Sequence, residues 1–187
     1  IDKNGPRSIK PHPAQEPHFC IFEYIYFSRP DSFIFGECVD TIRRSIGRQL
    51  AVEHPVKADI VISVPDSSNS AALGYSAVSG FPFEIGLIRN HYIGRTFIHP
   101  SQVTRDAKVR IKFNPVRGVL EGKRVVVVED SIVRGTTFKK ITQLLRSAGA
   151  REIHLRVSSP PIMYPCFYGM DFPTHEELLA SKWSVDE

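Results

Sequence analysis

One stretch in the second half of the chain combines residue types that could bind a phosphorylated sugar. The sequence VVVVEDSIVRGTT, Val125–Thr137, places two acids, Glu129 and Asp130, directly after four valines. Carboxylates do not bind phosphate, but they accept hydrogen bonds from sugar hydroxyls and bind Mg²⁺ directly or through water. The acid pair therefore suits the ribose and metal side of such a ligand.

The residues after the acids suit the phosphate side of the same ligand. Ser131, Thr136 and Thr137 offer hydroxyl donors, and Gly135 lets the backbone approach an anion closely. The loop leads into an expected helix, whose first N–H groups are unpaired and carry the positive end of the helix dipole. The alternative is an acid pair that only caps this helix. Neither the Walker A pattern nor the Rossmann GxGxxG pattern is present.

Alternating strands and helices are expected to position this loop. Strands are predicted at the apolar runs Phe19–Phe27, 58–65, 81–88, 123–130 and 151–159. Helices are predicted at about 37–52, at 68–79 closed by Gly80, and at 136–148 ended by Gly149. The valine strand has no polar alternation, so it should be buried on both faces, as in a parallel sheet. The order predicts a doubly wound α/β sheet, which binds ligands beyond the carboxyl ends of its strands.

Length, composition and charge limit the class of protein to which the chain can belong. A chain of 187 residues with 42% apolar and 24% charged residues is typical of one soluble globular domain. No apolar run approaches the ~18 residues of a membrane span. Three separated cysteines argue against a disulfide framework and predict a reducing cytoplasm. The net charge of +4 suits an anionic small ligand and would also suit weak contact with nucleic acid. The sequence has no basic run with interleaved aromatic residues, so nucleic acid is not expected as the partner.

The motif around the acids resembles the phosphoribosyl pyrophosphate (PRPP) motif of phosphoribosyltransferases. Its form with Ser-Ile-Val-Arg-Gly-Thr-Thr resembles the amidophosphoribosyltransferase family. Over about 19–180, further stretches resemble signatures of that family, in its order: FEYIYFSRPDS, VPDSSNSAALGY, RNHYIGRTFIHPSQ, GKRVVVVEDSIVRGTT, SSPPI and PCFYGMD. The resemblance implies a type I phosphoribosyltransferase fold, with a central mainly parallel sheet flanked by helices and a flexible lid loop. Glu129 departs from the aspartate that the family usually has, although other phosphoribosyltransferases use Glu-Asp.

The resemblance also implies a reaction. Ammonia would attack C1 of PRPP, pyrophosphate would leave, and 5-phosphoribosylamine would form in the first step of de novo purine synthesis. The protein would mainly position the reactants and neutralise the leaving pyrophosphate, with Mg²⁺ sharing that charge. Purine nucleotides such as AMP and GMP would inhibit, and the protein would be a homo-oligomer.

The site residues implied by the family fall in three segments. Those expected to be catalytic are Glu129, Asp130 and Arg95. Those expected to bind the PRPP phosphate are Ser131, Ile132, Val133, Arg134, Gly135, Thr136 and Thr137. The pyrophosphate-side loop would be Asp66, Ser67 and Ser68, and the magnesium contacts would be Ser67, Glu129 and Asp130. A lid, 89–112, would contribute Arg95, Gln102 and Lys112.

Each segment also has a simpler structural explanation. Asp66 or Ser68 could cap the helix that follows. The segment 89–112, with six Arg or Lys against one acid, could be a solvated basic loop. Arg134 could reach a phosphate or point to solvent.

The resemblance covers one domain of a larger enzyme. Residues 1–18, with four prolines, are expected to be a linker or connecting arm, and residues 19–187 a phosphoribosyltransferase domain. The family's N-terminal glutaminase domain is not in this sequence. The chain would therefore use free ammonia, and the glutaminase domain of a longer parent chain would be its partner.

Two cysteines match ligand positions of a cluster that one branch of the family carries. Cys20 and Cys166 match two of the four cysteines that hold a [4Fe–4S] cluster, and the other two lie in a C-terminal region that this sequence lacks. A cluster is expected in the full-length protein and not in this fragment. The alternative is a pair of buried core cysteines.

Two other classes of function compete with this one. A non-catalytic PRPP-binding regulator would keep the fold and the motif, but such regulators usually carry a DNA-binding segment, and none is visible. A salvage phosphoribosyltransferase would need a hood that recognises a purine or pyrimidine base.

Overall fold

A three-stranded parallel sheet forms the centre of the molecule. The computed structural model describes residues 3, 5–90, 112–170 and 174–184. The sheet has the strand order β3-β6-β7, with bounds Ile60–Ser63, Arg124–Glu129 and Glu152–Val157. The valines of the middle strand, Val125–Val128, are fully buried. The predicted parallel strand, covered on both faces, is therefore confirmed.

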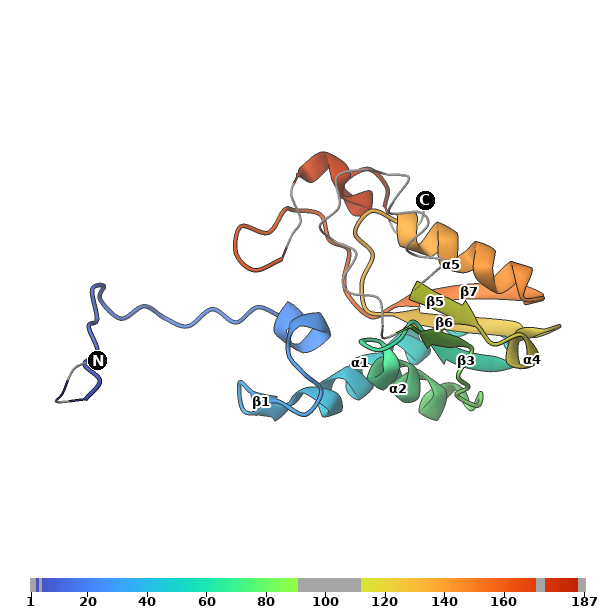
Figure 1. Cartoon of the computed structure of the whole chain (residues 1–187), viewed down its shortest axis with the longest axis horizontal. Coiled ribbons are helices and arrows are strands. Elements are labelled where there is room, and N and C mark those ends of the chain that lie inside the picture. Colours follow the sequence, from blue (N-terminus) through green and yellow to red (C-terminus); the bar gives the residue numbers. More distant parts are fainter. Residues whose placement is uncertain (1–2, 4, 91–111, 171–173, 185–187) are drawn as a thin grey trace.

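Helices cover both faces of this sheet. Helices α1 (Val39–Glu53) and α2 (Asn69–Ser79) lie on one face, and α5 (Thr136–Ser147) lies on the other (Figure 1). Because successive side chains of a strand point to opposite faces, the valines of β6 divide between the two layers. Val126 and Val128 pack with residues of α1 and α2, whereas Val125 and Val127 pack with residues of α5.

The two helices on the shared face approach each other backbone to backbone. A Cβ added to Gly47 of α1 would lie 1.9 Å from the carbonyl oxygen of Ala71, and one added to Gly74 of α2 would lie 2.1 Å from that of Arg44. Only glycine fits at either position. This close contact fixes α2, and with it the loop that precedes α2, relative to α1.

Shorter elements surround this core. They are the π-helix η1 (Glu23–Phe27), the hairpin of β1 (Phe33–Ile34) and β2 (Glu37–Cys38), the antiparallel pair β4 (Leu87–Arg89) and β5 (Phe113–Pro115), helix α4 (Arg117–Leu120), and the 3-10 helices η2 (His175–Glu177) and η3 (Leu179–Ser181). The predicted helices are confirmed, with starts and ends within a few residues, and Gly80 ends α2 in the left-handed conformation at φ 75°.

One strand prediction is wrong, and another is confirmed only in part. The run 19–27 ends in a π-helix, because the chain curls around the buried guanidinium of Arg43, which donates to the carbonyl oxygens of Tyr24 and Ser28. In the run 81–88, Phe83 forms an isolated parallel bridge to Val61 of β3, and only the last two residues enter a strand, β4, which pairs antiparallel with β5.

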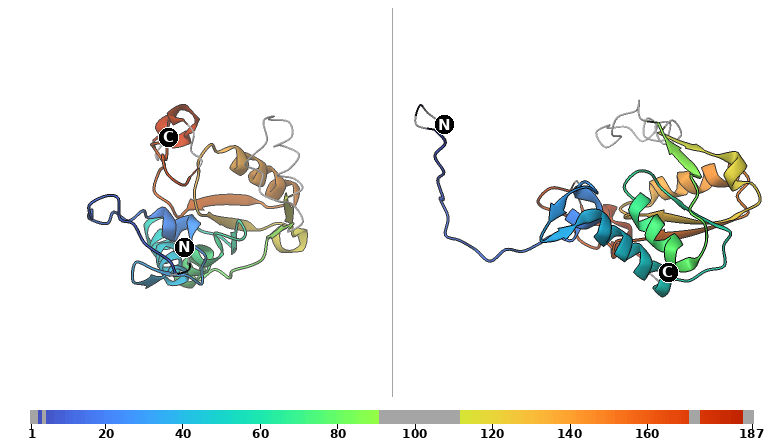
Figure 2. Two further views of the ribbon diagram at one scale, coloured as in Figure 1. Left: turned by 60° about the vertical axis from the view of Figure 1, so that its left-hand side comes forward. Right: turned by 90° about the horizontal axis from the view of Figure 1, so that it is seen from below.

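The first residues of the chain stand apart from the core. Residues 6–19 form no helix or strand and are exposed, and Figures 1 and 2 show them running away from the body of the molecule. In the part of the chain that the structure describes, no helix is long and apolar enough to cross a membrane.

Candidate functional site

The two acids lie at the carboxyl end of the central strand and are buried. Glu129 is 8% exposed and Asp130 is 5% exposed. The hydroxyl of Ser68, in the loop after the neighbouring strand β3, donates to Oε1 of Glu129 at 3.0 Å. The strand-end acids and the predicted pyrophosphate-side loop, which are 61 residues apart in sequence, therefore meet at one edge of the sheet.

The hydrogen bonds of the acids do not fit a helix cap. The backbone N–H of Asp130 donates to Oε1 of Glu129 at 3.1 Å, and the hydroxyl of Ser131 donates to Oδ1 of Asp130. The residue that caps α5 is Gly135, and within the described part of the chain no side chain caps that end of the helix. The alternative in which the acid pair only caps the helix is therefore wrong.

Burial shapes the ionisation of both acids. Loss of solvent raises the pKa of Glu129 well above its usual value, and the charge of Asp130 raises it further. Burial also raises the pKa of Asp130, partly offset by hydrogen bonds from Ser131 and Ser67. Two carboxyl groups in such a setting favour a cation or a ligand that donates hydrogen bonds.

The loop between β6 and α5 has the shape expected of an anion site. Gly135 has φ 71°, a left-handed conformation that favours glycine, and Thr136 and Thr137 open α5 with exposed side chains. The first N–H groups of a helix lack partners within it. Ile132 and Val133 turn their side chains to other parts of the molecule, a cavity and an apolar cluster, so their predicted phosphate contacts would be made by the backbone.

Arg134 is not directed simply to solvent. Its Nε donates to Oε2 of Glu177, in the 3-10 helix η2, and the two side chains are 30% and 43% exposed. The structure thus brings the C-terminal part of the chain against the predicted phosphate loop.

The loop between β3 and α2 departs from a simple helix cap as well. Ser68 is the residue before α2, but its hydroxyl donates to Glu129, and none of the described side chains caps the helix. Asp66 forms an ion pair with Arg89 at 2.8 Å, between Oδ2 and Nη1. Ser63, at the end of β3, donates to Oδ1 of Asn69 at 2.6 Å and so ties the strand to the helix.

The predicted lid is only partly described. Arg95 and Gln102 lie outside the described residues. Lys112 precedes β5, and its Nζ lies 5.1 Å from the ring centroid of Phe113. Arg89, the first residue of the predicted lid, ends β4 and forms an ion pair with Asp66. The predicted lid therefore begins beside Asp66.

Sequence reasoning missed Arg43 and the residues that hold α1 to α2. Arg43 is 3% exposed, and burial lowers the pKa of its guanidinium, an effect that the negative charges of Asp130 and Asp40 only partly offset. Asp40 accepts a hydrogen bond from Ser70 of α2 at 2.6 Å. The sequence does contain a signal that Arg43 is buried, because its position falls on the same helical face as Val39, Gly47 and Leu50.

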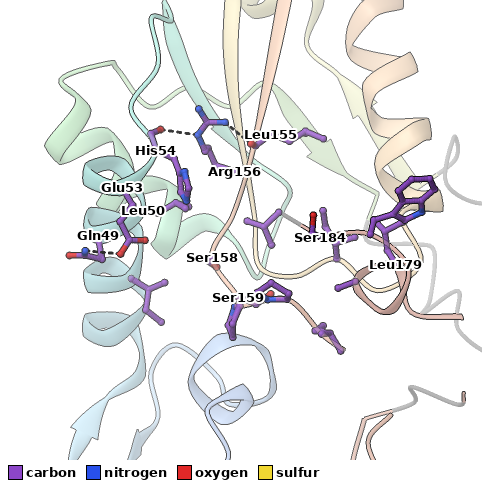
Figure 3. Close-up of a pocket in the computed structure, with 18 residues that line it drawn as sticks. Gln49, Leu50, Glu53, His54, Leu155, Arg156, Ser158, Ser159, Leu179 and Ser184 are labelled. Atoms are coloured by element: carbon purple, nitrogen blue, oxygen red, sulfur yellow. Dashed lines mark hydrogen bonds between the residues drawn. The ribbon is translucent and has the colours of Figure 1, made fainter. Parts of the chain in front are cut away.

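A cavity borders the loop between β6 and α5. It has a volume of about 790 Å³ and is lined by α1, β7, residues 158–162 and the C-terminal segment (Figure 3). Ile132 contributes to its wall, whereas Glu129 and Asp130 do not. Arg156 crosses from β7 to the carbonyl oxygen of His54, at the end of α1, at 2.9 Å. The two acids therefore do not line the cavity, although Ser158 and Ser159 in its wall donate backbone N–H groups to the carbonyl oxygens of Glu129 and Asp130.

The cysteines do not all behave as core residues. Cys20 is exposed, which makes the alternative of two buried core cysteines wrong for this residue. Cys166 is half-buried and packs against the cluster of Ile162 and Leu178. Within the described residues, no three His, Cys, Asp or Glu side chains gather in a metal-binding group.

Comparison with known proteins defines the class to which this fold and site belong. Residues 53–159, more than half of the chain, match the phosphoribosyl transferase domain. The chain therefore belongs to the phosphoribosyltransferase family, and the expected α/β fold is confirmed.

Within that family, the chain is similar over its full length to amidophosphoribosyltransferases. It is 59% identical over 187 residues to Amidophosphoribosyltransferase 1, chloroplastic, of Arabidopsis thaliana, covering 33% of that protein. It is 60% identical over 168 residues to the amidophosphoribosyltransferase of Bacillus subtilis, covering 35% of it. The chain thus spans about a third of the length of these relatives.

A solved structure of such a relative has the same fold. The glutamine PRPP amidotransferase from B. subtilis, complexed with ADP and GMP, superposes with a TM-score of 0.79 at 60% identity. The match covers 89% of this chain and 37% of that one. The predicted resemblance to amidophosphoribosyltransferases is therefore confirmed.

Proposed function

We propose that this chain is the phosphoribosyl-transfer domain of an amidophosphoribosyltransferase. It takes PRPP and ammonia, forms 5-phosphoribosylamine and releases pyrophosphate, in the first step of purine synthesis. The observation that carries the proposal is the pair of buried acids, Glu129 and Asp130, followed by a loop into the N-terminus of α5. The names of the relatives support it.

The two halves of PRPP divide between the acids and the loop. The ribose hydroxyls donate to the carboxylates of Glu129 and Asp130, which offer acceptors in a site shielded from water. The 5′-phosphate lies on the loop 131–137, where the N–H groups at the start of α5 and the hydroxyls of Thr136 and Thr137 donate to it.

The acids also fit the Mg²⁺ that the family implies. Burial raises the pKa of both carboxyl groups, and a neighbouring cation stabilises their ionised forms. Ser67, Glu129 and Asp130 would supply oxygen ligands, which Mg²⁺ prefers, and water and substrate would complete the set. When bound, the ion shares the negative charge of the pyrophosphate.

The remaining residues position the groups that react. The lone pair of ammonia forms a bond to C1 of PRPP as the bond from C1 to the pyrophosphate oxygen breaks, and the nitrogen then loses one proton to water. The loop 131–137 holds one end of PRPP, and Asp66, Ser67 and Ser68 lie beside the other end, so C1 is held between them. The lid residues Arg95, Gln102 and Lys112 would cover the site and exclude water.

The longer parent protein would add partners and regulation. A glutaminase domain would supply the ammonia, and subunits would assemble as a homo-oligomer. AMP and GMP would compete for this site, because they share a ribose 5′-phosphate with PRPP. The B. subtilis relative complexed with ADP and GMP supports this part of the proposal. The cytoplasmic location stays a prediction from the cysteine content.

A [4Fe–4S] cluster does not fit this chain alone, because it needs four ligands and the sequence has three cysteines. One of them, Cys38, precedes α1 and donates weakly to the carbonyl oxygen of Pro30. We propose that Cys20 and Cys166 bind a cluster in the full-length protein together with ligands from elsewhere. Iron and sulfide analysis of the full-length protein, purified without air, tests this proposal. Protein without iron would contradict it.

A nucleophile panel tests the proposed activity. Pyrophosphate release from PRPP and Mg²⁺ is measured with ammonium, with purine and pyrimidine bases, and with no nucleophile. Release that depends on ammonium alone is expected. Release that depends on a base would instead indicate a salvage enzyme, and PRPP binding with no release would indicate a PRPP-binding regulator.

A further inference from the structure

Three consecutive residues of the phosphate loop contact two residues near the C-terminus, Glu177 and Leu179. The carbonyl oxygen of Val133 accepts the N–H of Leu179 at 2.8 Å. Arg134 donates from Nε to the carboxylate of Glu177. A side-chain carbon of Leu179 lies 3.4 Å from where a Cβ on Gly135 would be. The segment 174–181 therefore packs directly against the loop.

The loop has few other supports. Residues 131–135 belong to no helix or strand. Within the described ranges, the bond to Leu179 is the one backbone–backbone hydrogen bond that residues 131–134 make. Leu178, which is fully buried, packs in the same apolar cluster as Val133 and so anchors the segment. The position of the loop thus depends on the segment.

The ion pair between Arg134 and Glu177 orients a guanidinium more than it stabilises the fold. Both side chains are partly exposed, at 30% and 43%, and an exposed ion pair contributes little to folding. Glu177 accepts from Nε, which is one of the five N–H donors of arginine. The four donors on Nη1 and Nη2 lie on the far end of the planar group. A carboxylate held at Nε therefore fixes the plane in which the other donors point.

We propose that Glu177 is a positioning residue, which holds the guanidinium of Arg134 so that its Nη groups meet the 5′-phosphate of PRPP. This role rests on the proposed function, in which the loop 131–137 binds that phosphate. Glu177 itself does not touch the substrate. It reduces the freedom that Arg134 must lose when PRPP binds.

The dissociation constant of PRPP, measured by calorimetry with Mg²⁺ on the whole protein, tests this role. Glu177→Gln keeps the shape and removes the charge, and a rise of roughly two- to tenfold is expected. Glu177→Asp, which keeps the charge, should recover part of the affinity. Glu177→Gln should add nothing to the loss caused by Arg134→Gln, because both remove the same interaction.

Glu176→Gln is the matched control, since it removes a neighbouring charge. Glu176 interacts with its own backbone, with Thr174 and with the charges of His175 and Lys182, not with the loop. The control should bind PRPP like the wild type. An equal loss in Glu176→Gln, or wild-type affinity in Glu177→Gln, would overturn the positioning role.

Two further measurements distinguish the positioning role from a purely structural role and from failure of the proposed function. The urea midpoint and kcat of Glu177→Gln should stay at wild-type values, and an affinity loss matched by a lower midpoint would indicate a structural residue and overturn the role. Failure of the wild-type protein to bind PRPP would overturn the proposed function, and the positioning role with it.

Discussion

The close contact between α1 and α2 predicts that Gly47→Ala destabilises the protein, although alanine is preferred over glycine inside a helix. Alanine is favoured over glycine inside a helix by about 1 kcal/mol, so preference alone predicts that Gly47→Ala stabilises the protein. In the structure, the new Cβ would lie 1.9 Å from the carbonyl oxygen of Ala71, whereas real Cβ contacts essentially never fall below 3.0 Å. The helices would have to separate by about 1.1 Å, the difference between these two distances.

That separation has a predictable cost. Overpacking of a core typically costs about 1–3 kcal/mol, and here it would also stretch the 2.6 Å hydrogen bond from Ser70 to Asp40. We expect Gly47→Ala to lower the free energy of unfolding by roughly 1–3 kcal/mol, measured by equilibrium urea denaturation.

A second glycine serves as the matched control. Gly118 lies in α4, and a Cβ there would meet no atom within 4 Å. Gly118→Ala should leave the stability unchanged or raise it by up to about 1 kcal/mol. A Gly47→Ala variant as stable as the wild type, or an equal loss of stability in both variants, would refute this expectation.

Three further changes test the core, an ion pair and the site. Val127→Ala removes two fully buried methyl groups and should lower the free energy of unfolding by about 1–3 kcal/mol in urea. Hydrogen bonds from Arg124 hold the pKa of Asp59 well below its usual value, about 3.9, so Asp59 stabilises the fold above that pH and less as the pH falls. Asp59→Asn should flatten the fall of the urea midpoint between about pH 5 and pH 2; an unchanged slope would contradict this. Ser68→Ala removes the hydrogen bond to Glu129 and should raise the KM for PRPP roughly tenfold, with the urea midpoint nearly unchanged.

The central strand and its helices could be predicted because their signals are local. An apolar run without polar alternation, such as Val125–Val128, is typical of a strand covered on both faces. Gly80 and Gly149 mark helix ends through their left-handed conformation. The rule that ligands bind beyond the carboxyl ends of parallel strands then placed Glu129 and Asp130 correctly at the edge of the sheet.

The errors and omissions arise from contacts between distant residues. The aromatic run 19–27 has the composition of a strand, but an apolar run alone does not distinguish a strand from a helix. Hydrogen bonds from the buried Arg43 to the carbonyl oxygens of this region stabilise a curled backbone instead. The pairing of Arg134 with Glu177, 43 residues later, leaves no pattern in the sequence. Such contacts depend on how the finished chain packs and could not be read locally.

We propose that the carboxyl end of β6 is the reaction centre. The direct test compares ammonium-dependent pyrophosphate release, under single-turnover conditions with PRPP and Mg²⁺, in the wild type, Asp130→Asn and Asp31→Asn. Asp31 is an exposed aspartate, with a side chain 66% accessible, and its variant should match the wild type. Asp130→Asn should lose at least about 100-fold in rate while its urea midpoint still reports a folded protein. Release by Asp130→Asn at the wild-type rate would contradict the account.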